Sequence, residues 1–350
     1  MTSITIKRLN ISSELQKIFD SFPSETQNSI CHLYSWYQSY INVNQQQDVF
    51  FLVVYSGQNP IAIFPIKLQK LTKWLPFIYY AELYYSNEMG QCDFIATKPF
   101  NNYWVEIKKY LKSNNVHLFR FQSISENSHA VQSGILQDSD YYTLSHFSKW
   151  LSCTDTHENF LSKFKSKFRA NLKRKYNNAS KLGKISFTSY NCTQDLKISF
   201  ERFLKVEDSG WKGADGTSIL KQPKAKAYYL SMLNNLGPSN QCLINILSID
   251  DKDIAATFCL TTNNIIHILK IGYDEDYNKI SPGQLIVNEM IKYTELNQEF
   301  NTISFITDMS WMDIWKPNKT KVYVAYKSVT WLGNVLINGL KFYKKNKNKD

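Results

Sequence analysis

The sequence lacks the patterns that mark most metal sites and disulfide-stabilised folds. Its six cysteines are scattered, and the closest two, Cys242 and Cys259, are 17 residues apart. There is no C-x-x-C pair and no H-E-x-x-H motif, so the usual zinc signatures are missing. A chain of 350 residues also needs no disulfide to complete its core. We therefore expect reduced cysteines and no bound metal.

Long uncharged apolar runs are missing as well. None approaches the roughly 20 residues that a helix needs to cross a bilayer, so we expect no transmembrane segment. The opening "MTSITIKRLNISSELQKIF" lacks the basic flank, apolar core and cleavage site of a secretory signal. These absences favour a cytoplasmic protein. At 43% hydrophobic and 15% aromatic residues the chain is globular, and its length favours two domains.

Acidic residues are absent from one long stretch of a chain whose net charge is +11. Residues 162–184 contain nine Lys or Arg and no acid, and the final "KFYKKNKNKD" adds five lysines. Such charge attracts nucleotides, coenzyme phosphates, tRNA or acidic lipids without choosing among them. Within the stretch, a four-residue spacing predicts a helix with one apolar face, formed by Phe164, Phe168, Leu172 and Tyr176. Its basic residues either face solvent or line an anion site, and the lack of acids favours the second.

Two segments of the chain follow the same plan. "FFLVVYSGQNPIAIFPIKL" (50–68) and "CLINILSIDDKDIAATFCLTT" (242–262) each predict a β-hairpin. Ile61-Ala62 and Ile254-Ala255 fall at matching places after the two turns, 193 residues apart. Each hairpin is followed by a strand, a turn with a glycine, a helix and another strand. Unless this is a coincidence of generic patterns, the chain has an α/β fold, with a mixed sheet in each of two similar modules.

These patterns also suggest where one module ends and the next begins. We expect a first module over residues 1–150 and a second over residues 151–335, joined near residues 148–162. A basic tail, residues 336–350, would follow the second module.

The short stretch "SPG" at residues 281–283 stands between a strand and a helix. Ser281 suits a helix cap, and Pro282 suits the first turn, where its missing N–H has no partner. Gly283 leaves the backbone uncovered, so a ligand can approach the free N–H groups and the positive end of the helix. The turn is therefore either a seat for a phosphate or pyrophosphate, or an ordinary capped helix without a ligand.

Several spaced motifs resemble the BioF-like, CelD/FemAB-type branch of the GNAT acyltransferases. They are Glu207 before "WKG" (211–213), then "GYDEDY" (272–277), then "SPG" (281–283), in the family's order. The resemblance covers about residues 160–330. It implies two tandem GNAT-like modules, acetyl-CoA or another acyl-CoA as cosubstrate, and direct attack of an amine on the thioester. One departure is that Met312-Asp313 stand before Trp315, where the family commonly has a lysine.

The resemblance also implies roles for particular residues. The coenzyme pyrophosphate would lie on the backbone of Lys279, Ile280, Ser281, Pro282, Gly283 and Gln284. The base would be Asp274 or Glu207, although either carboxylate can equally be a turn or surface group. Tyr323 would protonate the leaving thiolate. The acceptor would contact Trp211, Lys212, Arg169 and Lys173, while His267 is expected to be a buried, hydrogen-bonded core residue.

The implied activity is N-acyl transfer, most directly N-acetylation, to a small-molecule acceptor. We expect this acceptor to be a nucleotide-linked amino sugar for surface polysaccharide biosynthesis. The alternative is a FemAB-type transfer from aminoacyl-tRNA to a peptidoglycan precursor, although no long charged helical hairpin for tRNA is present. A third hypothesis is a non-enzymatic module that binds nucleic acid or acidic membrane, but no known nucleic-acid motif appears and no DNA partner is expected.

The first module differs from the second at the turn that should hold the coenzyme. It reads "SNEMG" (86–90) where the second reads "SPG". We therefore expect a degenerate first module that has lost coenzyme binding and shapes the acceptor cleft.

Overall fold

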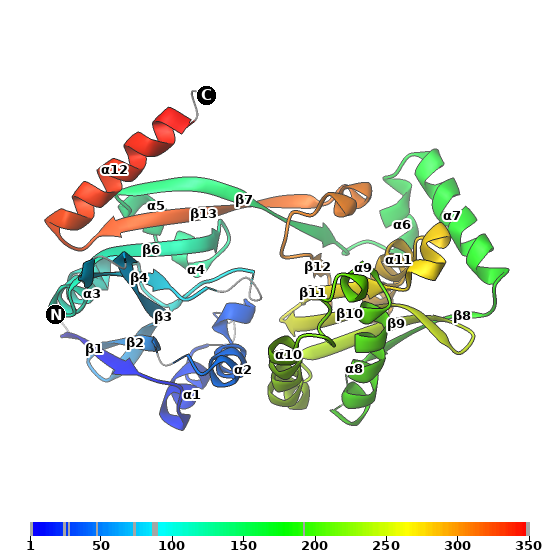
Figure 1. Ribbon diagram of the computed structural model, residues 1–350, viewed down its shortest axis with the longest axis horizontal. Helices are drawn as coiled ribbons and strands as arrows, with labels where there is room; N and C mark the ends of the chain where they lie inside the picture. Colours follow the sequence, from blue (N-terminus) through cyan, green and yellow to red (C-terminus); the bar gives the residue numbers. More distant parts are fainter. Residues whose placement is uncertain are drawn as a thin grey trace. The chain divides into compact units, whose positions relative to one another are not determined.

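The computed structural model describes residues 3–23, 26, 29–46, 48–72, 75–85, 90–191 and 193–347 (Figure 1). The chain forms two compact units. Unit 1 contains residues 1–41, 45–148 and 319–350, and unit 2 contains residues 42–44 and 149–318. Among the described helices, none is both long and apolar enough to cross a membrane. The five described cysteines are buried and free, and Cys192 lies outside the described residues.

Unit 1 is a mixed sheet with helices packed against it. Its strand order is β1-β2-β3-β4-β6-β13-β7, and the short β5 pairs with β3. The strands are β1 (Ile4–Leu9), β2 (Val49–Ser56), β3 (Asn59–Thr72), β4 (Leu75–Leu83), β5 (Ile95–Ala96), β6 (Val116–Ser125), β7 (Tyr141–Ser152) and β13 (Asn318–Ser328). The helices are α1 (Ser13–Asp20), η2 (Ile30–His32), α2 (Tyr34–Asn44), α3 (Asn101–Ser113), α4 (His129–Gln132), α5 (Ile135–Asp138) and α12 (Trp331–Lys347).

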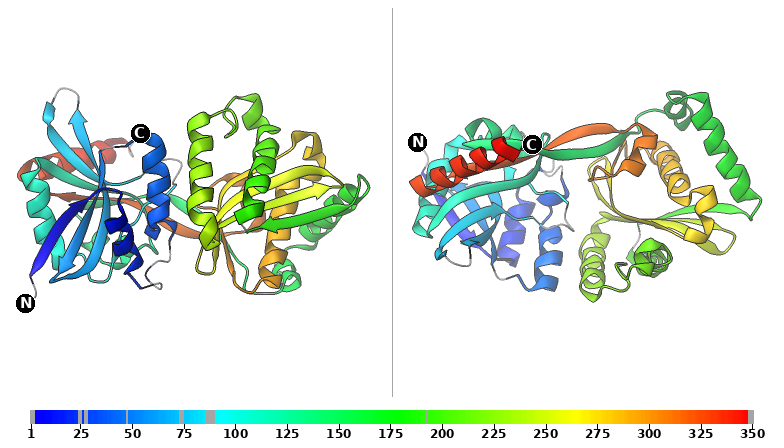
Figure 2. Two further views of the ribbon diagram at one scale, coloured as in Figure 1. Left: turned by 90° about the horizontal axis from the view of Figure 1, so that it is seen from below. Right: turned by 45° about the horizontal axis from the view of Figure 1, so that its top comes forward.

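Unit 2 repeats this design with the strand order β7-β12-β11-β10-β9-β8. Its further strands are β8 (Ile185–Tyr190), β9 (Cys242–Ile249), β10 (Lys252–Thr262), β11 (Ile265–Tyr273) and β12 (Thr302–Ser304). Its helices are α6 (His157–Ser162), α7 (Ser166–Ser180), α8 (Thr193–Asp208), α9 (Trp211–Ala214), α10 (Pro223–Leu236), η3 (Gly237–Ser239), η4 (Glu275–Ile280), α11 (Pro282–Leu296) and η5 (Ser310–Trp315). Figure 2 shows α8 and α10 on one face of this sheet and α11 on the other, with α7 beyond α11.

The two units match strand by strand, which confirms the predicted α/β fold with two modules. In both, three antiparallel pairings lead to one parallel pairing, β4 with β6 in unit 1 and β11 with β12 in unit 2. Both predicted hairpins are present, as β2–β3 and β9–β10. Ile61 and Ile254 are each the extra residue where the hairpin register shifts, so the repeated Ile-Ala marks the same β-bulge in both units.

The boundaries of the units differ from the expected ones at the end of the chain. We placed residues 319–335 in the second module, whereas β13 pairs with β6 and belongs to unit 1. The expected tail, residues 336–350, begins inside α12, which also packs on unit 1. Conversely, β7 lies almost wholly within the expected first module, yet its last residues pair with β12 in unit 2. Local patterns identify strands but not their partners. The sequence therefore did not reveal that β13 pairs within unit 1 or that β7 pairs with β12.

The core of unit 2 explains why the basic stretch folds as a helix. Phe164 and Leu172 are buried in this core, and Phe168 and Tyr176 pack against it. Phe164 lies just before α7, and the other three form the predicted apolar face of that helix. The lysines of α7 are thereby left on its remaining faces.

Candidate functional site

Strands β11 and β12 separate after three residue pairs. Parallel pairing joins residues 265–267 to residues 302–304, but β11 continues to Tyr273. The chain after β12 bends toward β7, where the Phe305 N–H donates to the Lys149 carbonyl at 2.9 Å. At this bend Ile306 has a φ of 63°, a strained conformation for a β-branched residue. Within the described chain, residues 268–273 therefore have no strand on this side, which leaves an opening in the sheet.

Among its described residues, unit 1 lacks the corresponding opening. There the parallel pairing runs along β4 from Tyr79 to Glu82, and the strand ends one residue later. Glu82 is buried and accepts a hydrogen bond from Gln69 Nε2 at 2.8 Å. The turn from which we predicted a loss of coenzyme binding cannot be compared directly, because residues 86–89 lie outside the described residues.

The "SPG" turn starts α11, as predicted, but Ser281 does not cap the helix with its side chain. Ser281 adopts a left-handed conformation, φ 55° and ψ 65°. Its carbonyl accepts from the N–H groups of Gln284, at 2.9 Å, and Leu285, at 3.2 Å. Ser281 is therefore the N-cap residue, as expected, but its side chain makes no capping hydrogen bond. Pro282 is the first helical residue, and no acceptor for the Gly283 N–H is present among the described residues.

Gly283 is not required by packing within the chain. A Cβ atom at this position would meet only the ring of Tyr273, at an ordinary 3.5 Å. Its conformation is not one that favours glycine, because its φ is not in the left-handed range. Without a Cβ, Gly283 leaves the backbone at the start of α11 open to close approach by a ligand.

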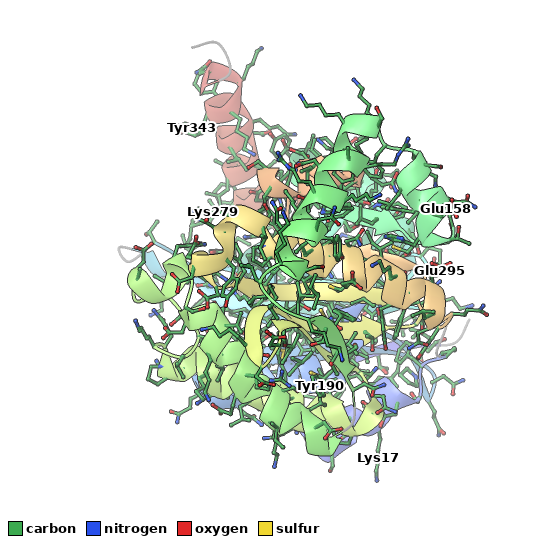
Figure 3. The ribbon with its side chains drawn as sticks, turned by 90° about the vertical axis from the view of Figure 1, so that its right-hand side faces the viewer. Lys17, Glu158, Tyr190, Lys279, Glu295 and Tyr343 are labelled. Carbon is green, nitrogen blue, oxygen red and sulfur yellow. The ribbon has the colours of Figure 1, made fainter. Side chains whose placement is uncertain are left out.

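The other residues of the predicted pyrophosphate turn differ in exposure. Lys279 is exposed on the surface (Figure 3), whereas Ile280 and Pro282 are buried. Gln284 is buried, and its Oε1 accepts a hydrogen bond from Lys175 Nζ of α7. Burial lowers the pKa of Lys175. The start of α11 thus combines backbone N–H groups with a lysine held next to them.

The predicted residues Glu207 and Lys212 lie together beside the open part of β11. Glu207 is buried, and its Oε2 accepts from the Ile219 N–H at 2.8 Å. Its Oε1 lies 3.1 Å from Lys212 Nζ, which also donates to the Ile271 carbonyl of β11 at 3.3 Å. The Lys212 side chain is 22% exposed, so its ammonium group reaches solvent from this strand.

Two glycines permit this close approach. A Cβ at Gly272 would lie 2.7 Å from the Cα of Glu207, and one at Gly213 would lie 1.7 Å from the Asp208 carbonyl oxygen. Both glycines belong to the motifs singled out in the sequence, so "WKG" and "GYD" each pack closely against the end of α8. Trp211 next to them is 57% exposed, which excludes a core role.

Asp274, the other predicted base, has structural partners. It caps η4, because its Oδ1 accepts from the Asp276 N–H at 3.1 Å. Its Oδ2 lies 3.0 Å from Lys252 Nζ, and its side chain is 5% exposed. The structure does not bring Asp274 into contact with the Glu207–Lys212 pair. Its catalytic role stays a prediction.

The remaining predicted site residues lie apart from that pair. Arg169 donates to the carbonyls of Ser162, at 3.2 Å, and Phe164, at 2.8 Å, and so joins α7 to the preceding turn. Lys173 is exposed on α7. Tyr323 lies on β13 in unit 1, opposite Ile124 of β6, so it is not part of unit 2. His267 is buried and hydrogen-bonded to Thr262 at 2.8 Å, as expected for a core residue.

A buried lysine near the opening was not found from the sequence. Lys149 of β7 is 2% exposed and lies 2.7 Å from Asp308 and 2.8 Å from Asp313. It also donates to the Met309 carbonyl at 3.1 Å, and these bonds raise its pKa. Asp313, which stands where the family commonly has a lysine, is thus paired with a lysine from another strand. The two partners are too far apart in sequence for a local pattern to reveal the pair.

Basic residues of the acid-free stretch surround a hollow beside α7. The hollow of about 620 Å³ is lined by Lys165, Lys167, Arg174 and Lys316, with Phe168 and Ile314 among its apolar walls. The sequence signal was the run without acids, but the two residues we chose from it, Arg169 and Lys173, do not line the hollow. No group of His, Cys, Asp or Glu in the described part of the chain could hold a metal ion.

Comparisons with known proteins agree with this geometry. Residues 166–311 match the family model of the acetyltransferase (GNAT) domain. A search of curated proteins found no match to the sequence.

Three solved structures are similar over nearly the whole chain. FemX is 10% identical with a TM-score of 0.56, covering 91% of this chain and 96% of its own. A conserved protein of unknown function from Bacteroides thetaiotaomicron VPI-5482 is 12% identical with a TM-score of 0.56, covering 93% and 100%. L-PGS from Bacillus licheniformis is 12% identical with a TM-score of 0.53, covering 94% and 96%. At these identities the likeness is one of fold.

Proposed function

We propose that this chain, which belongs through residues 166–311 to the GNAT acetyltransferases, transfers an acyl group from acyl-CoA to the amine of an amino sugar. The family recognised in the sequence is confirmed by that match, and the chain is an acyltransferase. The donor and the acceptor are our proposal. One observation carries it: the gap between β11 and β12 opens beside the start of α11 in unit 2, and the described residues of unit 1 have no such gap.

The gap and the helix start suit the two ends of an extended thioester. We place the pantetheine arm along residues 268–273. There the arm takes the place of the missing strand and contacts backbone groups of β11. The pyrophosphate then lies on the backbone from Lys279 to Gln284, at the positive end of α11. Lys175, held next to this turn by Gln284, adds a positive charge. Acetyl-CoA is the donor that we propose first.

The chemistry needs one proton acceptor and a fixed geometry. The amine nitrogen attacks the thioester carbon, the carbon–sulfur bond breaks, and the thiolate takes up a proton as it leaves. We assign removal of the amine proton to Glu207, directly or through water, because its Cα, Cβ and Cγ pack against Gly272 at the open part of β11 and its carboxylate pairs with Lys212 there. Lys212 holds that carboxylate in place and faces solvent beside it.

We propose a nucleotide-linked amino sugar of surface polysaccharide biosynthesis as the acceptor, and a cytoplasmic location for the reaction. The exposed Trp211 supports a ring-shaped acceptor, because an indole on the surface can stack on a sugar or a base. Lys212 lies on the same short helix, next to Trp211.

A Fem-type transfer from aminoacyl-tRNA to a peptidoglycan precursor is the second candidate. The likeness in fold to FemX across 91% of this chain supports this candidate as strongly as the first is supported. Under both candidates the reaction takes place in unit 2. We propose that unit 1 binds no acyl-CoA, because β4 stays paired with β6 almost to its end.

Thiol release tests the two candidates against each other. Purified protein is incubated with acetyl-CoA and a panel of nucleotide-linked amino sugars, and free coenzyme thiol is followed over time. The matched control for each acceptor is the same sugar with its amine already acetylated. We expect release with at least one free amine and none with its control. If no amino sugar causes release while aminoacyl-tRNA is consumed with a peptidoglycan precursor, the second candidate replaces the first.

A further inference from the structure

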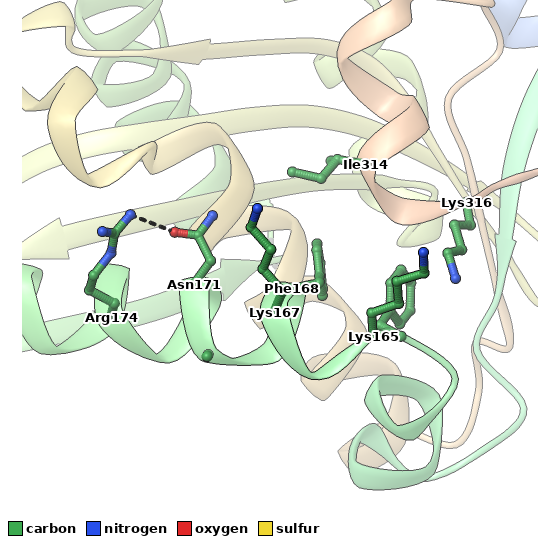
Figure 4. Close-up of a pocket in the computed structure, with 9 residues that line it drawn as sticks. Lys165, Lys167, Phe168, Asn171, Arg174, Ile314 and Lys316 are labelled. Atoms are coloured by element: carbon green, nitrogen blue, oxygen red, sulfur yellow. Dashed lines mark hydrogen bonds between the residues drawn. The ribbon is translucent and has the colours of Figure 1, made fainter.

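The hollow beside α7 is a separate feature of unit 2. One wall is α7 itself, with Lys165, Lys167 and Arg174, and the other is formed by Ile314 and Lys316 at the end of η5. Figure 4 shows the lysines of both walls directed toward the space between them. Phe168 forms part of the apolar surface and is held by Trp315, whose ring centroid lies 5.5 Å away. The hollow thus combines an aromatic wall with four cations.

No acid lines the hollow to balance those cations. Its lining contains two aromatic rings and four Lys or Arg but neither Asp nor Glu. Among the described residues, no ion pair involves Lys165, Lys167, Arg174 or Lys316, and Arg174 donates only to the amide oxygen of Asn171, at 2.9 Å. The four positive charges in the hollow repel one another, and no acid of the chain offsets this repulsion. An anion bound in the hollow would reduce it.

The hollow leads to the start of α11. Arg174 lines the hollow, and the next residue, Lys175, donates to Gln284 in the first turn of α11. From Lys165 to Arg174 the helix rises by about 14 Å, at roughly 1.5 Å per residue. A ligand on the "SPG" turn that extends along α7 therefore reaches the hollow.

We propose that this hollow binds the adenosine 3′-phosphate end of the acyl-CoA cosubstrate. The 3′-phosphate contacts Lys165 and Lys167, and the adenine ring stacks on Phe168. The proposal rests on the proposed function, because it assumes that the pyrophosphate lies at the start of α11. It assigns the basic stretch to the donor, whereas we expected from the sequence that Arg169 and Lys173 of this stretch contact the acceptor.

The test compares coenzyme A with dephospho-coenzyme A, which lacks only the 3′-phosphate. Calorimetric titrations at one salt concentration use the wild-type protein, the double variant Lys165→Gln/Lys167→Gln, and the control Lys173→Gln. Lys173 is exposed on the same helix but does not line the hollow, so the control removes one charge of that helix outside the hollow, where the double variant removes two charges inside it. Glutamine keeps the helix propensity close to that of lysine, and thermal unfolding checks that all variants fold.

We expect the wild type to bind coenzyme A at least about tenfold more tightly than dephospho-coenzyme A, since charge-assisted contacts to the phosphate are lost. The double variant should lose that difference, and Lys173→Gln should keep it. If the double variant still discriminates as the wild type does, the proposal is wrong although the proposed function stands. If the double variant binds each coenzyme with the affinity of the wild type but has a raised KM for the amino sugar, the proposal is wrong and the hollow binds the acceptor. If the wild type binds neither coenzyme, the proposed function itself fails.

Discussion

The Glu207–Lys212 pair gives the sharpest expectation about how the motifs work together. Glu207 is 1% exposed at its side chain and has two partners, the Lys212 ammonium at 3.1 Å and the Ile219 N–H at 2.8 Å. Lys212→Met removes the ammonium but keeps most of the apolar stem. The Glu207 carboxylate is then buried with one hydrogen bond and no counter-charge.

The expected cost is large for a single side chain. Leaving a buried charge without its partner costs about 3 to 5 kcal/mol, and we take the lower end because Lys212 is 22% exposed. For a unit of this size, about 3 kcal/mol lowers the melting temperature by roughly 6 to 12 °C. Glu207→Gln should cost less, about 1 kcal/mol, because the amide oxygen still accepts from Ile219 and the lysine reaches solvent. The double variant Glu207→Gln/Lys212→Met leaves no charge unpaired, so it should be more stable than the sum of the single variants predicts.

The assay is chemical unfolding of all four proteins, with thiol release measured on each. If Glu207 is the base, Glu207→Gln should also lower kcat by about a hundredfold or more while the protein stays folded. The reasoning is refuted if Lys212→Met unfolds within about 0.5 kcal/mol of the wild type, or if the two substitutions are additive.

Two further expectations concern His267 and Lys149. Burial lowers the pKa of His267 to about 4, so the folded protein resists a proton that the unfolded chain takes up near pH 6.5. Stability should therefore fall by up to about 3 kcal/mol as the pH drops from about 6.5 to 4, and His267→Phe should flatten this part of the curve of unfolding free energy against pH. An unchanged curve would mean that other groups cause the acid sensitivity. Lys149→Met should speed amide hydrogen exchange in residues 305–316, because Asp308 and Asp313 lose their shared partner. Lys163→Met is its control, since it breaks only an exposed pair with Asp155, and equal exchange in the two variants would contradict the role given to Lys149.

The sequence allowed the local parts of this structure to be predicted. Alternating apolar residues around polar turns predicted both hairpins, and the repeated Ile-Ala marked the shared bulge. The helix face of Phe168, Leu172 and Tyr176 followed from a four-residue spacing. These features depend on residues that are close together in the chain.

Features that depend on distant residues could not be predicted. The pairing of β13 with β6 joins segments about 200 residues apart, so the second module was drawn too long. The Lys149 pairs with Asp308 and Asp313 join strands and loops that are equally far apart in sequence. Ser281 is the N-cap residue that its type suggested, but the left-handed backbone and the missing side-chain bond were not visible in the sequence. Which lysines of α7 line the hollow depends on where η5 packs, and the helix pattern alone does not contain that information.

A titration with acetyl-CoA tests the central claim, that one coenzyme binds per chain at the "SPG" turn. The wild type is compared with Gly283→Asp and Gly283→Asn, which have the same size, and a Cβ fits at this position. An acid in the first turn stabilises a helix, so Gly283→Asp should not unfold the protein. At about 5 Å from a phosphate its charge should cost about 3 kcal/mol, or about two orders of magnitude in affinity. We expect one site per chain, kept in Gly283→Asn and lost in Gly283→Asp; equal binding by the two variants would contradict the account.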